Sequence, residues 1–129
     1  MEIPAGKIQE YENIYNCLRR EVIEETGLTI NKIQDEENAE IISINGYNVL
    51  NYTPFSNSQN IEGYYPIMVQ VFICTANESS INSFTSNETK NVRWEKLSII
   101  EKILNDQKKF YPMHISTLHK YIKCKKENK

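Results

Sequence analysis

Hydrophobic residues recur with the spacing of a helix in three parts of this 129-residue chain. The first helix is predicted over residues 12–26, and Gly27 follows where a left-handed C-cap closes many helices. Two further helices are predicted over residues 97–105 and 113–124, and the Lys-rich end after them is expected to fray. Residues 1–11 show no sustained periodicity and predict a strand end and a loop.

Strand signals occupy the middle of the chain. Two β-rich runs, residues 40–45 and 47–52, meet at an Asn-Gly pair, which predicts a hairpin. Residues 67–75 form the most apolar run and predict a central strand. The polar stretch before them, residues 53–66, predicts a loop. The Asn/Ser-rich stretch after them also predicts a loop, and it leads into a short strand around Trp94.

Composition bounds the class of protein. The length fits one domain over residues 1–129, with 40% hydrophobic and 25% charged residues as in ordinary globular proteins. A net charge of -2 provides no basic field for nucleic acid. No apolar run approaches the length of a membrane span. The three cysteines are an odd number without CxxC spacing, which favours a reducing compartment, and we expect a cytoplasmic protein.

The first helix gathers carboxylates beside its apolar residues. On a helical wheel Glu21, Glu24 and Glu25 share one face with apolar side chains, whereas Glu12, Asn16, Arg19 and Thr26 fall opposite. Carboxylates grouped near a helix C-terminus repel one another and the helix dipole, and a hard divalent cation would relieve both effects. The alternative is a solvated Glu-rich helix end in which Arg20 pairs with Glu24 four residues later.

The order of residues from Gly6 to Leu28 narrows this choice. The stretch "GKIQEYENIYNCLRREVIEETGL" resembles the signature of the Nudix hydrolases, GX5EX7REUXEEXGU with U an aliphatic residue. The nine fixed positions are filled by Gly6, Glu12, Arg20, Glu21, Val22, Glu24, Glu25, Gly27 and Leu28. So many specified positions at fixed spacing make a chance match a poor explanation.

The resemblance implies a fold and a reaction. The fold would be an α+β Nudix-type α/β/α sandwich with a mixed β-sheet. The reaction would be Mg²⁺-dependent or Mn²⁺-dependent hydrolysis of the diphosphate in a nucleoside-diphosphate derivative. Metals serve such a reaction by neutralising the diphosphate and activating water.

The resemblance also assigns roles to residues. Glu21, Glu24 and Glu25 match the metal ligands of the family, and a backbone carbonyl of Ala5 or Gly6 matches the loop ligand. Glu12 and Arg20 match positions that support the helix and its carboxylates. Either Glu24 or Glu25 is a candidate general base.

Further candidates lie outside the signature. Glu88 precedes Trp94 as an additional ligand or base does in some Nudix enzymes, although a solvated loop acid is an alternative. Tyr47 and Tyr64 are candidates for stacking on a nucleobase, and cross-strand packing is the alternative. The lead-in "EIPAG" resembles that of ADP-ribose and nucleotide-sugar pyrophosphatases, so we expect a nucleotide-type small molecule as substrate.

The resemblance further implies strands before the signature, whereas this chain begins almost on the signature loop. We therefore expect a Nudix domain that lacks its usual first strands, and a homodimer is one way in which another chain would replace them. Two alternatives to a hydrolase follow. The chain would be a non-catalytic nucleotide-binding module, or an incomplete and inactive fragment.

Overall fold

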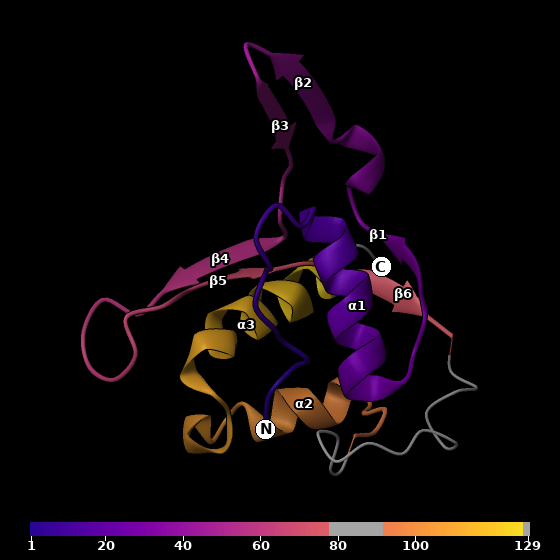
Figure 1. Ribbon diagram of the computed structural model, residues 1–129. Helices are drawn as coiled ribbons and strands as arrows, with labels where there is room; N and C mark the ends of the chain where they lie inside the picture. Colours follow the sequence, from indigo (N-terminus) through magenta and orange to yellow (C-terminus); the bar gives the residue numbers. More distant parts are fainter. Residues whose placement is uncertain (78–91, 128–129) are drawn as a thin grey trace. The chain divides into compact units, whose positions relative to one another are not determined.

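The computed structural model describes residues 1–77 and 92–127 (Figure 1). Its helices and strands are, in chain order, α1 (Ile14–Thr26), β1 (Ile30–Ile33), the 3-10 helix η1 (Glu36–Asn38), β2 (Glu40–Ile44), β3 (Tyr47–Asn51), β4 (Ser56–Gln59), β5 (Met68–Val71), β6 (Cys74–Ala76), α2 (Leu97–Ile103), the 3-10 helix η3 (Gln107–Lys109) and α3 (Pro112–Glu127). Helices thus combine with short antiparallel strands, which confirms the α+β class.

Both ends of α1 are defined by capping groups. The side chain of Asn13 accepts a hydrogen bond from the Tyr15 N–H at 2.8 Å, so the helix begins two residues later than the hydrophobic pattern predicts. Gly27 adopts the left-handed conformation, with a φ of 74°, and its N–H donates to the Ile23 carbonyl. The predicted C-cap is therefore confirmed.

The β2–β3 hairpin is also confirmed, together with the position of its turn. Ile44 pairs with Tyr47 across a two-residue turn, and the register runs without a shift to Glu40 and Asn51. Asn45 and Gly46 have φ values of 53° and 84°. Positive φ at both central residues is what a type I′ turn requires, and it explains why Asn-Gly is a reliable hairpin signal.

The strands pair differently from the single mixed sheet that was expected. Among the described residues there are three separate two-stranded antiparallel sheets, β1–β6, β2–β3 and β4–β5. The predicted central strand over residues 67–75 is wrong, because β5 pairs with β4 and β6 pairs with β1. The pairing partner changes at Phe72 and Ile73, and hydrophobicity alone carries no signal of such a change.

Two smaller predictions also differ from the structure. Residues 56–59, expected in a loop, form β4, and residues 92–96 around Trp94 form no strand. The two C-terminal helices are confirmed, with α2 shorter and α3 longer than predicted. Most of the predicted Asn/Ser-rich loop, residues 78–91, lies outside the described residues.

The chain divides into two compact units. Residues 4–55 and 72–92 form one, which contains α1 and is called the signature unit. Residues 1–3, 56–71 and 93–129 form the other, called the helical unit. The prediction of one domain over residues 1–129 stays a prediction.

The core of the signature unit forms between α1 and β1. Tyr15, Ile30 and Ile33 are buried there, and Ile33 is fully inaccessible. Tyr52 and Phe72 approach the Tyr15 ring edge-on, with ring centroids 6.3 and 6.0 Å away. Aromatic packing of this kind fixes the core-facing side of α1 and so sets which of its side chains face outward.

The core of the helical unit joins its helices to the chain's N-terminus. Four buried apolar residues form this core: Leu104, Phe110, Leu118 and Ile122. Ile3 packs against them, and its N–H donates to Nδ1 of the buried His114 at 3.3 Å. Burial lowers the pKa of His114, although the nearby Glu2 carboxylate opposes this effect. The first three residues are therefore held by a neutral imidazole.

None of the helices in the described ranges 1–77 and 92–127 is long and apolar enough to cross a membrane.

Candidate active site on helix α1

Arg20 is the centre of the polar network on α1. Its Nε and Nη2 atoms donate to the two oxygens of Glu12 at 2.8 and 2.9 Å, respectively. Its Nη1 atom donates to Glu21 at 2.6 Å and, more weakly, to Glu24 at 3.3 Å. Nη2 also donates to the Lys7 carbonyl at 3.1 Å. One guanidinium thus connects three signature carboxylates to the loop that precedes the helix, which only arginine's fork of donors can do.

Glu12 is the most strongly held of these carboxylates. Besides the two bonds from Arg20, its Oε1 atom accepts the Gln9 N–H at 3.0 Å. These hydrogen bonds, led by those from Arg20, lower the pKa of Glu12 from its ordinary 4.5 to about 2. The same contacts raise the pKa of Arg20. Both groups therefore stay ionised across the physiological range.

Gly6 lies directly against Glu21. A Cβ atom placed on Gly6 would come within 1.9 Å of the Glu21 Cδ and 2.0 Å of Oε2, far inside van der Waals contact. Any larger residue at this position would push the end of the Glu21 side chain aside, so glycine matters here for this close approach and not for a positive φ. The loop backbone consequently reaches the carboxylate itself.

Glu25 makes a second contact between the loop and the helix. Its Oε2 atom accepts the Ala5 N–H at 2.9 Å, twenty residues away in sequence. Glu24 lies further from the loop, with about half of its side chain exposed (48%). The structure therefore places Glu21 and Glu24 on Arg20, and Glu25 on the backbone of the loop that contains Ala5 and Gly6. Their assignment as metal ligands stays a prediction.

The buried face of α1 differs in part from the helical wheel. Thr26, which the wheel placed on the polar side, is buried because its Oγ1 donates to the Val22 carbonyl and accepts the Leu28 N–H. Tyr15 is buried as well. The buried face is thus centred between Leu18 and Thr26, and the glutamates lie along its border, with Glu21 half-buried and Glu24 exposed.

The donor chemistry of this site fits a hard divalent cation. Carboxylate and carbonyl oxygens are the ligands that Mg²⁺ selects, and the Glu21 carboxylate occupies the space beside Gly6 that a side chain there would fill. In this structure, however, Glu21 accepts a hydrogen bond from Arg20, and Glu25 accepts one from the Ala5 N–H. Within the described part of the chain, no group of three or more His, Cys, Asp or Glu side chains is arranged to hold a metal ion.

The remaining predicted site residues lie elsewhere. Tyr47 begins β3 in the signature unit and Tyr64 lies between β4 and β5 in the helical unit, with 70% and 90% of their surfaces exposed. Each ring is accessible to a nucleobase, and its exposure is equally compatible with an ordinary surface tyrosine. Glu88 lies outside the described residues.

Sequence reasoning missed one pair on the same helix. Arg19 donates through Nη1 and Nη2 to both oxygens of Glu36, at 2.9 and 2.6 Å. This contact lowers the pKa of Glu36 and raises that of Arg19. The two residues are 17 positions apart, which is far beyond the i,i+4 spacing of a helix, so the sequence pattern does not predict this ion pair. It provides a matched counterpart to Arg20 on another face of α1.

Comparison with known proteins identifies the family. A family model described as the NUDIX domain matches residues 1–114, which is most of the chain. The chain therefore belongs to the Nudix hydrolase family, a family of pyrophosphohydrolases. Searches of curated proteins and of solved structures returned no match.

Proposed function

We propose that this chain is a Mg²⁺-dependent hydrolase that cleaves the diphosphate of a nucleoside-diphosphate derivative. The observation that carries the proposal is the Arg20 network, in which one guanidinium gathers Glu12, Glu21 and Glu24 of a complete signature. A helix built only for packing has no reason to concentrate carboxylates beside a glycine that touches one of them.

Glu21, Glu24 and Glu25 would hold the cation, together with a backbone carbonyl of Ala5 or Gly6. Mn²⁺ selects the same oxygen ligands and would serve as a substitute. When bound, the cation neutralises the diphosphate and makes water a better nucleophile. Glu21 and Glu24, which contact Arg20, would then also hold the cation, and Glu12 would keep its two bonds to Arg20.

Arg20 acts as a positioning residue in this account. It is anchored by Glu12 and by the Lys7 carbonyl, so it presents Nη1 to Glu21 and Glu24 from a fixed place. Glu24 is the better candidate for general base. Among the three carboxylates that Arg20 contacts, Glu24 has the longest hydrogen bond, at 3.3 Å, and the most exposed side chain, so it can reach an attacking water. Glu25, by comparison, is bonded to the loop backbone.

ADP-ribose and nucleotide sugars are the first substrates to test. The support is the lead-in Glu2 to Gly6, "EIPAG", which resembles that of enzymes acting on these molecules. The exposed rings of Tyr47 and Tyr64 are candidates for stacking on the base, because aromatic faces stack on nucleobases with little regard to identity. Glu88 remains a candidate for a further ligand or base.

We also place the protein in the cytoplasm. The support is that Cys17, Cys74 and Cys124 are all free thiols, as a reducing compartment would keep them.

A substrate panel tests the proposed function. The purified chain would be incubated with ADP-ribose, nucleotide sugars, dinucleoside polyphosphates and nucleoside triphosphates, with Mg²⁺ or with a chelator, and the products separated by ion-exchange chromatography. The proposal expects Mg²⁺-dependent release of a nucleoside monophosphate from at least one diphosphate. Tight binding of a nucleotide without turnover would instead identify a non-catalytic binding module.

A further inference from the structure

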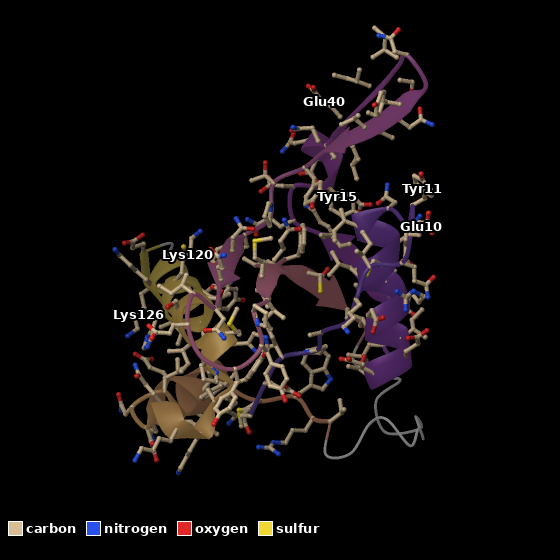
Figure 2. The ribbon with its side chains drawn as sticks, turned by 60° about the vertical axis from the view of Figure 1, so that its left-hand side comes forward. Glu10, Tyr11, Tyr15, Glu40, Lys120 and Lys126 are labelled. Carbon is tan, nitrogen blue, oxygen red and sulfur yellow. The ribbon has the colours of Figure 1, made fainter. Side chains whose placement is uncertain are left out.

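One face of the β2–β3 hairpin exposes four large apolar side chains. Ile42 pairs with Val49 and Ile44 pairs with Tyr47. Because alternate residues of a strand point to the same side, these two pairs share one face, here called the Ile42 face. Each of the four is more than half exposed, from 51% for Val49 to 70% for Tyr47. Figure 1 shows the hairpin extending away from α1, and Figure 2 shows side chains projecting from it beyond Glu40 at its base.

The opposite face of the hairpin has a different character. It carries Ile41 and Leu50, of which Leu50 packs against the core of the signature unit. Ser43 and Asn48 form a hydrogen bond with each other across the strands on this face. The opposite face thus combines a polar pair with Leu50 packed on the core and exposes one large apolar side chain, Ile41, whereas the Ile42 face exposes four.

We propose that the Ile42 face packs face to face against the same face of a second copy of this chain. Sheets stack in this way when their apolar faces meet, with side chains interdigitating between them. The proposal does not depend on the hydrolytic reaction, because none of its residues belongs to the signature. It assigns Tyr47 to the interface between copies, and this leaves Tyr64 as the candidate for stacking on a base.

The charge distribution favours a second copy as the occupant. Glu40 is the one charged residue of β2 and β3, and its pair with Asn51 lies on the Ile42 face at the base of the hairpin. No residue from Ile41 to Asn51 is charged, so the four apolar side chains of two such faces meet without like-charge repulsion. A partner that recognises its target by charge would find nothing to pair with on this stretch. A two-fold dimer uses the same patch on both copies, so one apolar face is self-complementary by construction. Natural hairpins commonly carry charges or proline against such pairing, and this one has a single charge, Glu40 at its base, and no proline.

The exposed area fits a weak dimer. Since a large apolar or aromatic side chain offers on the order of 100–200 Å² when accessible, the four together present roughly 400 Å² per copy. Patches of about 300–600 Å² are often functional. Two copies and the rim around them would reach about 1,000 Å², the lower bound of a specific interface. We therefore expect an association that is visible at tens of micromolar protein and is lost on dilution.

Sedimentation velocity over a protein series from about 1 to 200 μM tests the proposal, with Ile42→Lys and Ile41→Lys as a matched pair. Both substitutions add the same charge to neighbouring exposed positions of β2, but on opposite faces. The wild type should shift from monomer to dimer along the series. Ile42→Lys should weaken this association ~10-fold or more, because it buries a charge in the interface. Ile41→Lys should leave it within about threefold, since its side chain points away.

Hydrogen exchange of the β2 and β3 amides completes the test. The backbone amides of β2 and β3 should become more protected at high protein concentration than at low concentration, because the second copy covers the hairpin. A protein that sediments as a monomer at every concentration would overturn the proposal, whatever the protection of these amides. Equal weakening by both lysines would also overturn it, because the contact would then not be specific to the Ile42 face. Thermal melts of each variant show that loss of association is not loss of folding.

Discussion

Arg20 holds the Glu12 carboxylate through two parallel hydrogen bonds of 2.8 and 2.9 Å, and this pair anchors the guanidinium that contacts Glu21 and Glu24. The two residues are eight positions apart and the entry to α1 lies between them, so the pair also fixes how the loop enters the helix. Glu12 is not itself a proposed cation ligand, but by holding Arg20 it helps to position Glu21 and Glu24, which are.

Replacement of Arg20 by lysine should reduce Mg²⁺-dependent hydrolysis by ~10–100-fold, the usual cost of removing a group that orients metal ligands. Lysine keeps the charge but cannot bond Glu12 twice and reach Glu21 as well. The measurement is kcat and KM over a Mg²⁺ titration. Arg19→Lys is the control, because Arg19 bonds Glu36 in the same bidentate manner on the same helix. Equal losses in the two variants would reduce Arg20 to a structural role.

Gly6→Ala should displace Glu21 and weaken Mg²⁺ activation, because the new methyl group would lie 1.9 Å from the Glu21 Cδ. A displacement of this order can cost up to ~10²-fold in rate. Gly46→Ala is an informative control. Gly46 has a φ of 84° and nothing within 4 Å of an added Cβ, so alanine there strains the backbone without touching the site. Its melting temperature should fall while its Mg²⁺ dependence stays that of the wild type, and a normal Mg²⁺ response in Gly6→Ala would contradict the account.

The Glu12–Arg20 pair should make the signature unit sensitive to acid. The pKa of Glu12 is depressed from 4.5 to about 2 in the folded chain, so the stabilisation is complete above pH 4.5 and is lost as the pH falls toward 2. Glu12→Gln should reduce the pH dependence of unfolding in that window, and part of it should remain because Arg19 also lowers the pKa of Glu36. Urea unfolding followed at pH 6, 4 and 2.5 compares the two proteins. If the free energy of unfolding changes with pH equally in the two proteins, Glu12 does not form the stabilising pair with Arg20.

His114 predicts a second window at higher pH. Burial depresses its pKa below the ordinary 6.5, so the unfolded chain takes up a proton that the folded chain excludes, and stability declines as the pH falls below 6.5. His114→Gln should lower stability at pH 8, because the ring is buried, but should flatten the decline between pH 7 and 5. Thermal melts over that range measure it. An unchanged slope in the variant would assign the decline to another group.

The local features of the fold could be read from the sequence. Gly27 as a C-cap and the Asn45-Gly46 turn each follow from a residue whose backbone preference acts within a few positions. The signature likewise identified the residues that gather around Arg20. Strand partners could not be read, since the apolar run through Phe72 changes from one partner to another without a change in composition. β4 escaped prediction because Ser56, Asn57 and Gln59 have no β-branched or aromatic side chain.

Contacts made by the backbone were equally beyond the sequence pattern. The Lys7 carbonyl bonds Arg20, and the Ala5 N–H bonds Glu25, through atoms that every residue possesses. Their partners are set by the path of the loop and not by residue type. The same reason applies to Arg19 and Glu36, whose 17-residue separation is closed only by the turn from α1 into β1 and η1.

The central claim is that the carboxylates of α1 form a Mg²⁺-dependent hydrolytic site. Its most direct test is the rate of diphosphate hydrolysis by Glu24→Gln, measured with and without Mg²⁺ beside the wild type and the exposed-acid control Glu37→Gln. The account predicts Mg²⁺-dependent turnover by the wild type and by Glu37→Gln, and a loss of ~10²–10⁴-fold in kcat for Glu24→Gln with nucleotide binding retained. Equal turnover by Glu24→Gln, or turnover that a chelator leaves unchanged, would contradict it.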